Sequence, residues 1–338
     1  MKILITGING FVGSNLVGAL RKGYEIYGLD IINPSKNGVA KTFPWEDLPS
    51  IPEVDAIIHL AGKAHDTKAF NKFTSQQTEE YFKVNTELTK KIYDYFLAHD
   101  DIKKFIFFSS VKAVADKAEG ILTENVVPVP VGPYGESKIK AEEYIKCASG
   151  LRLFDPSCVP SVASERSSSA TGSMTAGKQT YILRPCMIHG PGNKGNLNLL
   201  YGVVKKGIPW PLGAFENKRT FTSIDNLCYI IKELLTQDVE SGVYNISDDE
   251  AVSTNELIEI ICSALGKKAR IWRIPCGLMR SAAKVGGWLH LPLNPERLQK
   301  LTENYVSSNA KIKKALGIKQ LPIRAKDGLM KTIRSFNK

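Results

Sequence analysis

The chain has 338 residues, of which 43% are hydrophobic and 23% are charged. These fractions match ordinary soluble globular proteins, so they disfavour disordered, collagen-like and membrane-spanning classes. Lysine and arginine outnumber aspartate and glutamate by 45 to 34, and residues 251–338 hold 17 basic and 5 acidic side chains, which accounts for all of the net positive charge. A solvated helical surface explains this basic segment; a phosphorylated substrate, an anionic lipid surface or nucleic acid are the alternatives.

Targeting signals and cysteine spacing point to one compartment. No apolar run approaches the ~18 to 20 residues that a membrane span requires, and Lys2–Thr6 predicts a strand where a signal peptide would lie. The six cysteines form no CxxC pair and no Cys/His cluster, which predicts reduced thiols without a metal site or a disulfide framework. We therefore expect a cytoplasmic protein with no bound metal.

Short β-branched runs alternate with helical stretches along the first 110 residues. Repeated βαβ units require parallel strands with right-handed crossovers, so the pattern predicts an α/β fold with a doubly wound parallel (Rossmann) sheet. The predicted strands are Lys2–Thr6, Glu25–Asp30, Ala56–Leu60, Phe105–Ser109, Gln179–Leu183 and Val243–Ser247, and the first helices are Phe11–Lys22 and Thr78–His99.

A glycine-rich segment follows the first strand and opens the first helix. It reads Thr6-Gly-Ile-Asn-Gly-Phe-Val-Gly13. Glycines at 7, 10 and 13 allow a tight turn, close approach of a pyrophosphate to bare backbone, and close packing of helix on strand. Asp30 ends the second strand, where its carboxylate can accept hydrogen bonds from ribose hydroxyls and repel a 2′-phosphate. The segment predicts binding of NAD(H); a structural turn with a loop-capping aspartate is the alternative.

A tyrosine and a lysine stand four residues apart at Tyr134 and Lys138. On a helix this spacing places both side chains on one face, where an ammonium favours the phenolate. Tyr201 and Lys205 have the same spacing, and we interpret that second pair as an ordinary helix face.

Two hydroxyls, Ser109 and Ser110, distinguish the first pair from the second. They lie at the carboxyl end of a predicted strand, and ligands bind at this edge of open α/β sheets. A hydroxyl there can hydrogen-bond a substrate oxygen beside Tyr134. Tyr134, Lys138, Ser110 and Ser109 are therefore the predicted catalytic residues.

The ordered series of motifs resembles the extended short-chain dehydrogenases/reductases that modify nucleotide sugars. The resemblance rests on the glycine segment, Asp30, His59-Leu-Ala-Gly62, Asn85, Ser109-Ser110, Tyr134 with Lys138, and Leu183-Arg-Pro185 followed by Gly190-Pro-Gly192. Within the family the chain is most similar to UDP-sugar 4-epimerases and to bacterial 4-reductases of UDP-4-keto-6-deoxy-N-acetylhexosamines. Gly192-Asn-Lys-Gly-Asn196, Pro209-Trp-Pro-Leu-Gly213 and Arg219–Asp225 carry this closer similarity.

The resemblance implies NAD as cofactor and a UDP-sugar as substrate. The implied cofactor-binding residues are Gly7, Gly10, Phe11, Val12, Gly13, Asp30, Leu60, Ala61, Gly62, Asn85, Tyr134, Lys138 and Pro185. Asn196 and Arg219 correspond to positions that contact the UDP diphosphate; for Arg219 an ordinary surface arginine is the alternative. A homodimer is a further implication, and we expect no nucleic-acid partner.

Three features depart from the family pattern. Val111 stands where the epimerases usually have the catalytic serine or threonine, so Ser110 or a water would have to act instead. His189 replaces the usual aromatic residue before Gly-Pro. A serine-rich insertion over residues 155–178 precedes the strand that begins at Gln179. We predict that this insertion is a mobile surface segment.

The sequence thus predicts a Rossmann domain over residues 1–185 and a smaller, mostly helical substrate lobe over residues 186–338, with the strand at 243–247 returning to the sheet. Helices are expected in the lobe at Thr254–Leu265, Gly277–Leu289 and Asn309–Leu316. The second of these is apolar but carries Arg280 and Lys284, which favours a helix packed on the lobe over a membrane-surface helix.

The expected activity is 4-epimerisation of a UDP-hexose or UDP-N-acetylhexosamine. A 4-ketoreductase is the alternative enzyme. A non-catalytic NAD(H)-binding regulator is a remote alternative to both enzymes.

Overall fold

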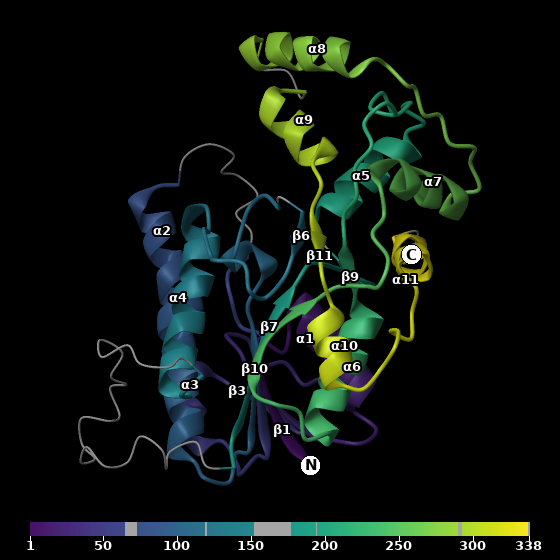
Figure 1. The fold of residues 1–338 in the computed structure, drawn as a ribbon. Helices are drawn as coiled ribbons and strands as arrows, with labels where there is room; N and C mark the ends of the chain where they lie inside the picture. The colour runs from purple at the N-terminus through teal and green to yellow at the C-terminus, as the bar shows by residue number, and fades with distance from the viewer. Residues whose placement is uncertain (65–72, 119, 152–176, 194, 290–292, 337–338) are drawn as a thin grey trace.

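A parallel sheet forms the centre of the molecule (Figure 1). The computed structural model describes residues 1–64, 73–118, 120–151, 177–193, 195–289 and 293–336. In this part of the chain the sheet has seven strands, in the order β10-β7-β5-β4-β1-β2-β3. The strands are β1 (Lys2–Thr6), β2 (Glu25–Leu29), β3 (Lys41–Phe43), β4 (Ala56–His59), β5 (Lys104–Phe108), β7 (Gln179–Pro185) and β10 (Gly242–Ile246). The predicted doubly wound sheet is confirmed, and β3 is an edge strand that the sequence did not predict.

Alternate side chains of each central strand pack into two hydrophobic cores, one on each face of the sheet. Ile3 and Ile5 face the helices α1 (Phe11–Leu20) and α6 (Ile224–Thr236). Leu4 faces the opposite core, which is covered by α3 (Leu88–Ala98) and α4 (Gly132–Ala148). Figure 1 shows α2 (Ser75–Phe82), α3 and α4 on one side of the sheet, and α1, α6 and α10 (Ala310–Ala315) on the other.

The core on the α1 and α6 face extends the sheet domain beyond residue 185. Residues of α6, β10 and α10 pack with β1, β4 and β5 against α1. The chain therefore leaves the sheet domain after β7 and returns to it twice. Of the serine-rich segment 155–178, residues 155–176 lie outside the described part of the chain.

The C-terminal lobe is mostly helical and has a hydrophobic core of its own. It contains α5 (Asn196–Lys205), α7 (Thr254–Ala264), α8 (Cys276–Trp288), α9 (Pro295–Thr302) and α11 (Ala325–Ser335). The short strands β8 (Met187–His189) and β9 (Phe221–Ser223) pair with each other, and β6 (Ile121–Leu122) pairs with β11 (Val306–Ser307). The predicted helices at 254–265, 277–289 and 309–316 are confirmed to within one or two residues at each end.

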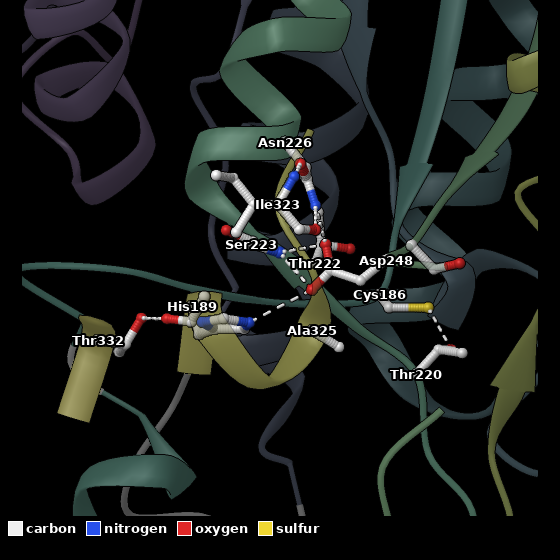
Figure 2. A network of polar contacts seen from close by, with 12 residues as sticks. Cys186, His189, Thr220, Thr222, Ser223, Asn226, Asp248, Ile323, Ala325 and Thr332 are labelled. Carbon is white, nitrogen blue, oxygen red and sulfur yellow. Dashed lines mark hydrogen bonds and ion pairs between the residues drawn. The ribbon is translucent and has the colours of Figure 1, made fainter. Parts of the chain in front are cut away.

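A buried carboxylate ties the lobe to the sheet domain (Figure 2). Asp248 follows β10 and accepts hydrogen bonds from the Ser223 backbone N–H at 3.0 Å and from Asn226 Nδ2 at 2.8 Å. Its Oδ2 also lies 3.6 Å from Nε2 of His189, whose Nδ1 is 2.9 Å from the Thr332 hydroxyl of α11. His189, which departs from the family pattern, thus links β8 to the C-terminal helix through polar contacts.

A second buried contact, between Glu142 and Arg184, fixes helix α4 on the sheet. Glu142 Oε1 accepts from Arg184 Nε at 2.8 Å, and Oε2 accepts from Nη2 at 2.5 Å. The Ser109 hydroxyl at the end of β5 donates to the same carboxylate at 2.6 Å. Burial on its own raises the pKa of Glu142, but the bonds from Arg184 outweigh it and hold the pKa below the usual value. The carboxylate therefore stays charged and joins α4 to β5 and β7.

We predict that Glu142→Gln lowers the free energy of unfolding by about 3 to 5 kcal/mol, because it leaves the buried Arg184 guanidinium without its counter-charge. Glu143→Gln, at the next position of the same helix, is the matched control and should change it by less than about 0.5 kcal/mol. Urea unfolding followed by circular dichroism measures both. The double variant Glu142→Leu/Arg184→Met should be milder than Glu142→Gln; equal losses in the three variants would contradict the proposed role of the pair.

Candidate active site

The predicted site residues meet at the carboxyl edge of the sheet. Parallel strands end at the same edge, so the segments that follow β1, β4, β5 and β7 lie side by side there. These segments begin at Gly7, Leu60, Ser109 and Cys186. Gly7 and Ala61 are in such close contact that a Cβ on Gly7 would lie 2.9 Å from Ala61 N and Cα.

The glycine segment forms a cradle of bare backbone. Gly7 has a φ of +66°, in the left-handed region that favours glycine. A Cβ on Gly13 would lie 2.6 Å from the Ile8 carbonyl oxygen, so only glycine lets α1 start this close to the turn. Gly10 precedes the first residue of α1, Phe11, and Phe11 and Val12 are half-buried. The N-terminus of α1 therefore presents backbone N–H groups to the place where a diphosphate would lie.

The carboxylate of Asp30 is held beside this cradle. Asp30 is buried, and it accepts hydrogen bonds from the backbone N–H groups of Asn9 at 2.9 Å and Ile31 at 2.7 Å. Lys36 crosses the same turn, donating to the Ile8 carbonyl at 2.8 Å and the Ser14 hydroxyl at 2.9 Å. Sequence reasoning singled out Asp30 and missed Lys36, because a lysine in an irregular segment carries no positional signal.

Gly62, Asn85 and Lys138 converge on one point beyond β4. A Cβ on Gly62 would lie 3.0 Å from both Asn85 Oδ1 and Lys138 Nζ. Asn85 lies in a single π-helical turn between α2 and α3; its Oδ1 accepts from the Lys63 N–H at 2.8 Å, and its Nδ2 donates to Ser137 Oγ at 3.0 Å. Asn85 thus positions the segment around Gly62 against α4. The predicted Leu60–Gly62 segment is brought to the same place as the predicted Lys138.

Lys138 is buried and donates to the Phe108 carbonyl at the end of β5, at 2.8 Å. Burial lowers the pKa of Lys138 to about 8, with the nearby Glu142 carboxylate acting in the opposite direction. The amine is therefore mainly an ammonium at neutral pH. One N–H of the ammonium group bonds the Phe108 carbonyl, and Nζ also lies close to Gly62.

Tyr134 precedes Lys138 by one helical turn and contacts Ser110. Burial raises the pKa of the Tyr134 phenol, and a hydrogen bond with the Ser110 side chain lowers it in part. The ring of Tyr81 packs edge-on against Tyr134, with 6.3 Å between centroids. Ser110 also caps the short 3₁₀ turn Val111–Ala113 by accepting from the Lys112 N–H at 3.2 Å. The structure therefore brings Tyr134, Ser110 and Lys138 together.

Neither Ser109 nor Val111 belongs to this group. The Ser109 hydroxyl is directed at Glu142, so the structure gives it a role in packing α4. Val111 is buried in a small apolar cluster with Val114, Leu122, Cys186 and Tyr305. The hydroxyl beside Tyr134 is therefore that of Ser110, one position before the usual place.

The two predicted diphosphate-binding residues occupy different settings. Arg219 stands just before β9, is half-buried, and donates from Nη1 to the Lys300 carbonyl at 2.9 Å. Cys186, which follows the buried Pro185 at the end of β7, is close enough to Arg219 for its pKa to be influenced by the guanidinium. Arg219 therefore lies toward the carboxyl edge of the sheet. Asn196 is exposed at the first position of α5.

Comparisons with known proteins give the family of this chain. Residues 3–152 match the NAD dependent epimerase/dehydratase family. UDP-glucose 4-epimerase of Vibrio cholerae is 30% identical over 81% of this chain and 78% of its own length. GDP-6-deoxy-D-mannose reductase of Pseudomonas aeruginosa is 23% identical over 83% of this chain and 85% of its own length. The crystal structure of UDP-glucuronic acid 4-epimerase from Bacillus cereus in complex with NAD superimposes with a TM-score of 0.68 at 20% identity, covering 100% of this chain and 99% of that one.

The chain belongs to the NAD-dependent epimerase/dehydratase family. The predicted resemblance is thereby confirmed. The residues fit the family's cofactor, because Gly7 and Gly13 allow the tight turn that begins α1 with bare backbone, and the Asp30 carboxylate lies beside that turn. No cluster of three or more metal-ligating side chains occurs in the described ranges.

We predict that Ser110→Ala lowers kcat by about 100- to 1000-fold, because it removes the hydrogen bond to the Tyr134 phenol at the reacting centre. Ser109→Ala is the matched control. It should leave kcat within about threefold while lowering the free energy of unfolding by about 1 to 3 kcal/mol, since it takes a bond from the buried Glu142. Steady-state kinetics and urea unfolding separate the two effects. A larger loss of kcat in Ser109→Ala than in Ser110→Ala would contradict the assignment.

Proposed function

We propose that the protein is an NAD-dependent 4-epimerase of a UDP-hexose or UDP-N-acetylhexosamine. The observation that supports this most strongly is the Tyr134 phenol, hydrogen-bonded to Ser110 and one turn from the buried Lys138, at the sheet edge beside a glycine cradle. The similarity to UDP-glucose 4-epimerase of Vibrio cholerae supports the same activity. NAD, when bound, supplies the hydride acceptor and donor.

The protein's residues would hold the sugar and move its proton. Tyr134, as phenolate, takes the proton of the C4 hydroxyl while C4 gives up hydride, and returns it when hydride is delivered to the other face. The Ser110 hydroxyl orients the C4 oxygen and stabilises the charge that develops on it. Lys138 favours the phenolate and would hold the nicotinamide ribose with its remaining N–H groups.

Charge determines where the nucleotide would lie. We assign the UDP diphosphate to Arg219 and Asn196, because a guanidinium presents several fixed donors to a diphosphate. Asp30, Gly7, Gly10 and Gly13 would hold the adenosine ribose and pyrophosphate of the cofactor.

A 4-ketoreductase of a UDP-4-keto-6-deoxy-N-acetylhexosamine is the second candidate. Val111 favours the reductase, because the buried side chain of valine stands where the epimerases usually have a hydroxyl. The similarity to a GDP-sugar reductase of Pseudomonas aeruginosa is also consistent with hydride delivery in one direction.

The purified protein with NAD distinguishes these activities. We expect it to interconvert the C4 epimers of UDP-N-acetylglucosamine or UDP-glucose without added reductant, as followed by proton NMR. Tyr134→Phe should lower this rate at least about 100-fold, because the reacting proton loses its base. Tyr201→Phe, which has the same spacing to Lys205 on α5, should leave it unchanged.

Two results would contradict the epimerase proposal. One is no interconversion of either substrate together with stoichiometric oxidation of NADH by a UDP-4-keto-6-deoxy-N-acetylhexosamine, which would establish the reductase. The other is turnover in Tyr134→Phe close to that of Tyr201→Phe, which would remove the assigned base.

A further inference from the structure

Helix α8 carries an apolar face that nothing in the described part of the chain covers. Met279, Ala283 and Gly286 are buried on one side of the helix, against the lobe. Leu278, Val285 and Leu289, spaced seven and four residues apart, lie on another side and are 61%, 54% and 52% exposed. Trp288 stands beside them and is 81% exposed. Burying one face fixes the helix on the lobe, so the apolar residues of the other face are presented to the outside.

The segment that contains this face is basic. Residues 260–295 contain six basic side chains and no aspartate or glutamate. Arg280 and Lys284 are exposed on α8 itself, and Lys267, Lys268, Arg270 and Arg273 are exposed in the segment that leads into it. The segment that includes α8 therefore carries positive charge only.

The inner face of α8 packs on the lobe, as its sequence predicts, and we propose that the outer face docks on an anionic phospholipid bilayer. Tryptophan and aliphatic side chains of an interfacial helix enter the boundary between headgroups and acyl chains, and lysine and arginine attract anionic headgroups. A second copy of the chain is a poorer occupant, because two copies meeting through this face would bring the six cations of each together. None of the described helices has the length and apolarity of a membrane span, so the contact is peripheral.

The position of α8 suits this role. The N-terminus and the start of β1 lie at one end of the molecule, and α8 lies at the other, toward which the parallel strands run (Figure 1). Docking through α8 would therefore hold the carboxyl edge of the sheet toward the bilayer. This surface and the catalytic group share no residue, so membrane docking and the proposed activity stand or fall separately.

Co-sedimentation of the full chain with vesicles tests the proposal. We expect binding to phosphatidylcholine vesicles that contain phosphatidylglycerol, and at least about tenfold weaker binding to phosphatidylcholine alone, since each basic side chain near an anionic surface contributes about fivefold. Arg280→Glu/Lys284→Glu and Val285→Glu/Trp288→Glu should each lower the partition coefficient at least about tenfold. Lys326→Glu/Arg334→Glu makes the same change of charge on exposed positions of α11 and should lower it by no more than about twofold.

A second measurement uses a conservative change that keeps the helix intact. Lipids with brominated acyl chains should quench the tryptophan fluorescence of the wild-type protein, and Trp288→Phe should remove most of that quenching while the protein still co-sediments. Four results would overturn the proposal: no binding to the anionic vesicles, equal loss in the α11 control, quenching unchanged in Trp288→Phe, or light scattering that shows a dimer broken by Val285→Glu/Trp288→Glu without vesicle binding.

Discussion

The charged contact between Glu142 and Arg184 is the constraint on which the candidate active site depends. Both side chains are buried, and Arg184 cannot lose Glu142 without leaving an unpaired charge inside the protein, whereas Glu142 is also paired with Lys146. The contact fixes α4 against β7, and the Ser109 hydroxyl fixes it against β5. Tyr134 and Lys138 lie on that same helix, about two turns and one turn before Glu142, respectively. Their distance from the strand ends is therefore set by a contact that itself takes no part in chemistry.

The segments at the carboxyl edge of the sheet form the rest of the candidate active site. Gly7 and Gly62 have no side chain, so the segment after β1 can pack against Ala61 and the segment after β4 against Lys138. Asn85 bonds the Lys63 backbone on one side and Ser137 on the other, so it connects the segment after β4 to the catalytic helix. The strand ends and α4 thus position the groups that we propose react, and the lobe beyond β7 adds Arg219, which we propose contacts the diphosphate.

The sequence was sufficient for the fold and for choosing candidate residues that the structure places at one edge of the sheet. Strand periodicity, the glycine segment and the Tyr134–Lys138 spacing are local signals, which can be recognised from the sequence alone. The roles of Ser109 and Ser110 could not be separated, because adjacent residues at a strand end point to different neighbours and only tertiary packing decides which. The contact between Glu142 and Arg184 gave no signal, since it spans 42 residues. Likewise, the sequence of α8 showed apolar residues but could not show which of its faces the lobe leaves uncovered.

The most direct test of the account follows the hydrogen at C4 of the sugar. UDP-N-acetylglucosamine or UDP-glucose carrying deuterium at C4 is incubated with the NAD-loaded protein in ordinary water, and both epimers are analysed by mass spectrometry and NMR. If Tyr134, Ser110 and Lys138 act on the C4 hydroxyl as described, the epimer that forms retains deuterium at C4, because the same hydride leaves and returns. Loss of the deuterium to solvent, or formation of an epimer at another carbon, would contradict chemistry at C4.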